Sequence, residues 1–191
     1  MNEAIVILII IGSVLLIPLI WFIATYNALV RLRNHCRESW AGIDTELKRR
    51  YDLIPNLVET VRGYADYEKE TLQKVIEARN KAQSSTGSPK VQAQDENAFI
   101  GTLKSLFALV ENYPDLKASQ NFLELQNELA NTEDRIQAAR RFYNANVRDI
   151  NTRIEVIPSN IVASIFGFRQ EEYFEIESAG ERANPDVSIK N

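Results

Sequence analysis

The sequence predicts an all-α protein in which an N-terminal transmembrane helix continues into an elongated antiparallel four-helix bundle. Three observations support this fold class. A 21-residue uncharged stretch lies near the N-terminus, apolar residues recur at steps of three and four through most of the remainder, and no alternating strand pattern occurs. We expect residues 1–26 to form a membrane anchor, 27–167 the helical bundle, and 168–191 an extended or flexible tail.

The uncharged stretch runs from Ala4 to Ala24. At ~1.5 Å per residue its length matches a hydrocarbon core about 30 Å thick. A cleaved signal peptide is the alternative, but it requires a basic N-terminal region and a shorter apolar core, whereas Glu3 makes this region acidic. We therefore expect a retained, single-pass anchor.

Aromatic and basic residues follow the span and are typical of a membrane interface. We expect five of them to contact membrane lipids: Trp21, Tyr26, Arg31, Arg33 and Arg37. No Lys or Arg precedes the span. The positive-inside rule therefore predicts that the C-terminal domain is cytoplasmic.

The stretch "YDLIPNL" raises the question whether Pro55 belongs to an active-site loop or to a corner between two helices. Asp52 is a good N-cap residue, and a proline in the first turn after it would lose no intrahelical hydrogen bond. The same proline in the middle of a helix would cost ~3 kcal/mol or more. The sequence therefore predicts a corner, followed by a second helix over residues 57–83.

Two further long helices are expected, over residues 94–112 and 122–157. The second carries a nearly heptad-spaced apolar stripe and ends at Pro158. Residues 159–168 form either a short helix capped by Ser159 or an apolar flap.

Few residues have the types and spacing that catalysis or metal binding requires. A di-iron bundle needs two Glu-x-x-His motifs, but His35 is the single histidine. Cys36 has no partner for an internal disulfide and points about 100° away from His35 on a helix, so the two make no nucleophile–base pair. We expect no cofactor, metal or catalytic site. A net charge of −4 also makes nucleic acid a poor partner.

Polar residues gather around the expected corner at mostly four-residue spacing. They are Asp44, Lys48, Arg49, Arg50, Asp52, Asn56 and Glu59. One interpretation is a partner or ligand site. The other is a set of helix caps and surface ion pairs worth ~0.2–1 kcal/mol each.

An apolar segment, "IVASIFGF", follows the last long helix. We expect five of its residues to form a surface for self-association: Ile161, Val162, Ile165, Phe166 and Phe168.

Two long runs in this sequence, "WAGIDTELKRRYDLIPNLVETVRGYADYEKETL" and "YPDLKASQNFLELQNELANTEDRIQAARRFYNANVRDINTRIEVIPSNIVA", resemble the LemA family. The resemblance implies a single-pass protein of the bacterial inner membrane with a bundle of long helices. It also implies an association with membrane proteases or other membrane proteins.

Three classes of function remain. The first is a non-enzymatic membrane scaffold that forms homo-oligomers. The second is an adaptor or regulator of another membrane protein, such as a membrane protease. The third is an enzyme whose carboxylate or metal site the sequence does not reveal.

Overall fold

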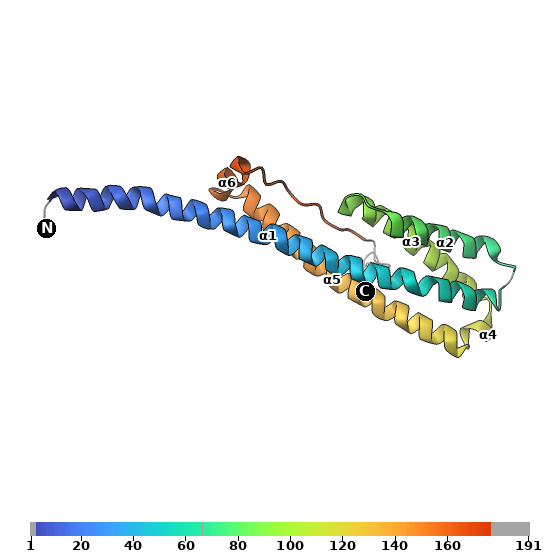
Figure 1. Ribbon diagram of the computed structural model, residues 1–191. Coiled ribbons are helices and arrows are strands. Elements are labelled where there is room, and N and C mark those ends of the chain that lie inside the picture. The colour runs from blue at the N-terminus through green and yellow to red at the C-terminus, as the bar shows by residue number, and fades with distance from the viewer. Residues whose placement is uncertain (1–2, 66, 177–191) are drawn as a thin grey trace, which may run out of the picture. The chain divides into compact units, whose positions relative to one another are not determined.

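Figure 1 shows a computed structural model of the chain, which describes residues 3–65 and 67–176. Within these ranges the structure is helical, with turns and one extended segment between or after the helices. The helices are α1 (Glu3–Arg62), α2 (Lys69–Ser84), α3 (Pro89–Val110), α4 (Pro114–Lys117), α5 (Gln120–Glu155) and α6 (Ser159–Ile165).

Helix α1 is 60 residues long and begins in the predicted membrane span. Over the described part of the chain, it is the one helix long and apolar enough to cross a membrane. Most of the described side chains of its span are exposed, and Leu15, Ile17 and Ile20 are all more than 60% exposed. From Thr25 onward one face of the same helix is buried. The first part of α1 therefore has a surface suited to lipid, and the rest has a surface suited to a protein core.

The predicted corner at Pro55 is wrong, because α1 continues through it to Arg62. A proline has no N–H, so the carbonyl of Tyr51, four residues earlier, loses its helical partner. Arg79 of α2 replaces that donor, with its Nε 3.1 Å from the Tyr51 oxygen. The buried stripe also continues across Pro55, since Ile54 and Leu57 are at most 1% exposed. Burial of such side chains, at ~1.5–3 kcal/mol each, offsets the cost of the proline.

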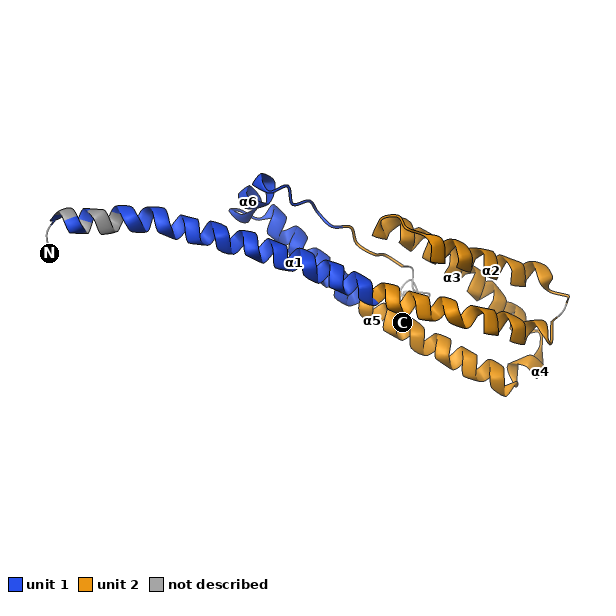
Figure 2. Ribbon diagram, in the orientation of Figure 1, with its two compact units in different colours: residues 1–42, 141–171 blue, residues 43–140, 172–191 orange. Residues whose placement is uncertain are grey.

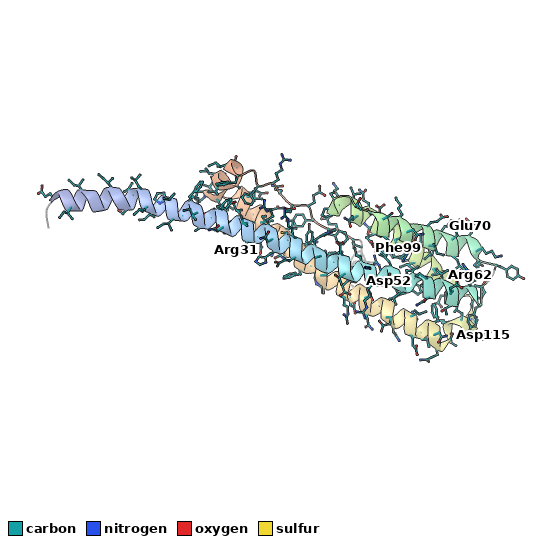
Figure 3. All side chains as sticks on the ribbon, viewed as in Figure 1. Arg31, Asp52, Arg62, Glu70, Phe99 and Asp115 are labelled. Carbon is teal, nitrogen blue, oxygen red and sulfur yellow. The ribbon has the colours of Figure 1, made fainter. Side chains whose placement is uncertain are left out.

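Consequently Asp52 is not a helix cap. It lies on the exposed side of α1, well before the helix end at Arg62 (Figure 3). The chain reverses after Gly63, and the Ala65 N–H donates to the Val61 carbonyl at 2.9 Å. The second helix therefore starts at Lys69, about twelve residues later than predicted.

The chain divides into two compact units (Figure 2). Unit 2 comprises Ile43–Arg140 and Glu172–Asn191, of which residues after 176 lie outside the description. Its four long segments are the end of α1, all of α2 and α3, and the beginning of α5, with the short α4 before α5. Most of their buried residues are apolar, among them Val58, Val75, Phe99, Leu106 and Phe122. The predicted four-helix bundle is thus confirmed in this unit.

Unit 1 comprises Met1–Gly42 and Arg141–Glu171, which contain the rest of α1, the rest of α5, and α6. Trp40 of α1 contacts Tyr143 of α5, with ring centroids 5.2 Å apart. Near the other end of α5, a small core forms from Leu29, Val162 and Ala163.

Residues 159–165 form the short helix rather than the flap. Ser159 is not its cap, because the N-cap position is Pro158. The Ser159 hydroxyl is buried and donates back to the carbonyls of Arg153 and Val156, at 2.7 and 3.0 Å. Ser159 therefore ties α6 to the end of α5.

The described part of the tail, residues 168–176, has no helix or strand and is partly buried. In unit 2, Phe174 is fully buried and Ile176 is 5% exposed. Arg140 of α5 donates to the Ile176 carbonyl, and Asn97 of α3 donates to the Glu175 carbonyl at 3.5 Å. The expectation for residues 177–191 lies outside the described residues.

Candidate functional site

A fully buried charged group of unit 2 is Arg50, which is 1% exposed. Its position on α1 is fixed by the buried stripe that also contains Leu47 and Ile54. The guanidinium donates to Glu96 of α3 through Nη2 and to Glu133 of α5 through Nη1, the latter at 2.8 Å. One arginine therefore connects three helices of the bundle.

Tyr51 and Phe99 complete this buried cluster. The Tyr51 hydroxyl donates to the second carboxylate oxygen of Glu96, which is itself 1% exposed. The face of the Phe99 ring lies against the Arg50 guanidinium, whose central carbon is 5.3 Å from the ring centroid. A cation over an aromatic face is favourable, so Phe99 contributes to holding the charge in the core.

Burial dominates the proton affinities in this cluster. It raises the pKa of Glu96 above the usual carboxyl value, although the Arg50 charge and the Tyr51 hydrogen bond both act to lower it. Burial and the neighbouring Glu96 carboxylate also raise the pKa of the Tyr51 hydroxyl, so Tyr51 stays protonated and remains a donor. Each group thus has a charge or hydrogen-bond partner within the cluster.

This geometry favours a structural role for the cluster. Both carboxylate oxygens of Glu96 already accept hydrogen bonds from the protein. In the part of the chain that the structure describes, no group of three or more His, Cys, Asp or Glu residues is placed to hold a metal ion. The cluster joins α1, α3 and α5 through paired charges, which favours the register in which these helices pack here.

Next to the cluster lies an open groove of about 400 Å³. Its walls come from α1, α2, α3 and the loop between the last two: Asp44, Leu47, Lys48, Tyr51, Ala82, Gln83, Ser85, Thr86 and Gln92. Partial desolvation raises the pKa of the Asp44 carboxyl. The groove therefore presents one acidic side chain, Asp44, and one basic side chain, Lys48, one helical turn apart on α1.

The seven polar residues expected at a corner do not form one site. Arg50 is in the core, whereas Asp44 and Lys48 line the groove. The others lie on the exposed side of α1, where Arg49 comes within 4.0 Å of Glu128 and Glu59 pairs with Arg62 at 2.7 Å. Asp52 and Asn56 are exposed.

Sequence reasoning missed Glu96, Glu133 and Tyr51 as members of the cluster. A signal existed for Glu96, which precedes Phe99 by three residues and Leu103 by seven and so falls on the apolar face of α3. A charged residue on such a face needs a buried partner. The sequence could not identify Arg50 as that partner.

In unit 1 the residues expected at the membrane interface are divided between exposed and partly buried positions. Trp21, Arg31 and Arg37 are exposed. Tyr26 instead contacts the ring of Phe166, with centroids 4.5 Å apart, and the Arg33 guanidinium lies 5.0 Å from the centroid of the Phe168 ring. Tyr26 and Arg33 therefore hold the segment after α5 against α1.

The five residues expected to form a self-association surface differ in exposure, and their role in self-association stays a prediction. Val162 is fully buried in the core of unit 1, and Phe168 packs against the same core. Ile161, Ile165 and Phe166 are 57%, 62% and 48% exposed. These three are the most exposed of the five, whereas Phe168 is partly buried.

These features define a class of protein: a helical bundle joined to an N-terminal helix that could span a membrane. The chain belongs to the LemA family, because the family's model matches residues 39–189. This finding confirms the resemblance seen in the sequence.

Three relatives are informative. Protein LemA of Metamycoplasma hominis is 29% identical over 170 residues, which cover 87% of this chain and 76% of the relative. Magnetosome protein MamQ of Magnetospirillum gryphiswaldense is 24% identical, with coverage of 88% and 73%. Magnetosome protein MamQ 2 of Paramagnetospirillum magneticum is 26% identical, with coverage of 84% and 70%. None of these names denotes an enzyme. The family and the apolar helix together point to a membrane-associated protein.

Proposed function

We propose that this protein is a non-enzymatic, single-pass scaffold of the bacterial inner membrane that self-associates. The observation that carries the proposal is α1, which runs unbroken from the apolar segment to Arg62 and contributes to both units. Every residue between the predicted span and Arg62 has helical backbone. Copies anchored in one membrane can therefore repeat the same lateral contact, which is how identical subunits form rings or arrays.

The buried polar groups support this proposal over an enzyme. The Arg50–Glu96 pair makes its hydrogen bonds within the bundle. A catalytic group would instead need to face a substrate cavity. The positive charges after the span, at Arg31, Arg33 and Arg37, favour a cytoplasmic bundle.

The test is the mass of full-length protein extracted from membranes in a mild detergent and measured by light scattering. The scaffold predicts one discrete species containing several 21.8-kDa chains. A species containing one chain at every protein concentration would contradict self-association. Amine crosslinking in the membrane before extraction is the control for assemblies that the detergent itself dissociates.

A second candidate, an adaptor or regulator of another membrane protein, is favoured by the groove in unit 2. Asp44 and Lys48 give it a charged wall next to the apolar Leu47 and Ala82, a mixture that suits a polypeptide partner. The double substitution Asp44→Lys with Lys48→Glu reverses both charges. An adaptor predicts that this variant loses a stoichiometric partner in a pull-down, whereas Asp52→Lys, an exposed change outside the groove, retains it. Equal recovery of the partner protein with both variants would show that the groove is not its binding site.

A further inference from the structure

The turn after α5 and the outer face of α6 expose a group of large apolar side chains. Ile157 is 82% exposed, and four others also face outward: Val156, Ile161, Ile165 and Phe166. The opposite face of α6 is buried, with Val162 and Ala163 at most 1% exposed. The short helix is therefore anchored in unit 1 on one side and uncovered on the other.

This exposed group lies beside the end of the predicted membrane span. The Phe166 ring contacts Phe22, with centroids 5.8 Å apart, as well as Tyr26. Phe22 belongs to the uncharged stretch Ala4–Ala24. If that stretch fills the hydrocarbon core, Phe166 lies at the depth of its C-terminal boundary, where side chains meet acyl chains and headgroups.

Charge near this level is net positive. Residues 22–37 and 150–170 contain five arginines (Arg31, Arg33, Arg37, Arg153 and Arg169) and a single acidic residue, Glu155. Three acidic residues, Glu38, Asp149 and Glu171, lie one residue outside these ranges. Four of the arginines are exposed, and Arg33 lies over Phe168. Exposed apolar side chains flanked by basic residues are the combination with which interfacial segments bind anionic bilayers.

We propose that residues 156–166 form an interfacial foot, a second membrane contact that inserts its exposed apolar side chains into the leaflet from which α1 emerges. The occupant of this surface is lipid at the headgroup–acyl boundary. The assignment does not rest on self-association. It takes Ile161 and Ile165 out of the surface expected for protein–protein contacts and leaves the bundle helices for that role.

The test places a nitroxide label at Ile161→Cys or Ile165→Cys in the full chain, reconstituted as single copies in nanodiscs of phosphatidylcholine with one-quarter phosphatidylglycerol. The native Cys36 is buried, and burial raises its pKa to about 11, so the wild type serves as the labelling blank. The matched control is Phe142→Cys, because Phe142 is 64% exposed, like Ile165 at 62%. The control position is also distant from the predicted span. Its neighbour Tyr143 contacts Trp40, which lies sixteen residues beyond Ala24, or ~24 Å along a helix.

Collision rates with oxygen, which partitions into lipid, and with a water-soluble nickel chelate give the result. The foot predicts that the labels at positions 161 and 165 collide with the chelate roughly threefold less than the Phe142 control, and with oxygen more. Chelate collision rates equal to that of the control would overturn the proposal. Shielding from both reagents would overturn it too, since that result means a protein segment covers α6. Because each nanodisc holds one copy, a failed self-association would not alter the outcome.

Discussion

Removing the positive charge from the buried cluster is the sharpest test of how the bundle is held together. In Arg50→Met the side chain stays long and apolar, but Glu96 loses its ionic partner and keeps only the Tyr51 hydroxyl. Taking one partner from a buried ion pair costs about 3–5 kcal/mol, because the remaining charge is left in the core. With a urea dependence of roughly 1–3 kcal/mol per molar, the unfolding midpoint should fall by about 1–5 M.

The pH dependence gives this prediction a second, independent readout. The pKa of Glu96 is raised in the folded protein, so its contribution to stability is fully present below the unfolded-state pKa and is lost as pH rises through the folded-state value. Removing Arg50 takes away the largest influence that lowers this pKa, and the pKa then rises further. The stability difference between the wild type and Arg50→Met should therefore be greatest near pH 7 and become smaller toward pH 5.

The assay is urea unfolding of full-length protein in dodecylmaltoside, followed by far-ultraviolet circular dichroism. Lys48→Met is the matched control, because Lys48 is an exposed cation on the same helix and should change stability by no more than about 0.5 kcal/mol. Arg50→Met combined with Glu96→Leu should recover most of the loss, since a buried pair can be replaced by apolar residues. An Arg50→Met protein as stable as the control at pH 7 would refute the description of the cluster.

Three further predictions follow from individual contacts. Arg79→Met should lower the free energy of unfolding by about 1–3 kcal/mol, because it leaves the Tyr51 carbonyl freed by Pro55 without a donor. The same change in a Pro55→Ala background should lower it much less. A double-mutant cycle of unfolding free energies measures the difference. Phe174→Ala should lower the free energy of unfolding by about 3–5 kcal/mol and expose the tail to limited proteolysis. Tyr173→Ala, a change at an exposed side chain, should do neither. Equal effects of the two substitutions would mean that the tail is not held by Phe174. The Cys36 thiol should react with a disulfide reagent at pH 8 roughly a hundredfold or more slowly than in the unfolded chain. The reason is that its pKa is raised to about 11, chiefly by burial and also by two nearby carboxylates. Reaction at the rate of the unfolded chain would show that Cys36 is accessible.

The long helices were predictable wherever the apolar pattern agreed with what is buried. The stripe over 122–157 predicted α5 to within two residues at either end, because its burial follows the same spacing of three and four. Pro55 misled the prediction for a physical reason. Local reasoning gives the cost of a mid-helix proline but cannot supply a donor from another helix, and Arg79 is that donor.

The candidate sites were less predictable, because their partners are distant in sequence. Arg50 and Glu96 are 46 residues apart, and composition alone grouped Arg50 with exposed neighbours such as Arg49. The same limit applied to α6. At a four-residue spacing Ile161 and Ile165 face outward while Val162 faces the core, but that division needs the position of α1 to be known.

The central claim, a membrane scaffold built by self-association, is tested most directly by counting chains in particles taken from the membrane with their lipid. Full-length protein extracted in a lipid-retaining polymer and imaged by electron microscopy should give uniform particles that contain several copies in a repeating arrangement. Particles that each contain one 21.8-kDa chain would contradict the account.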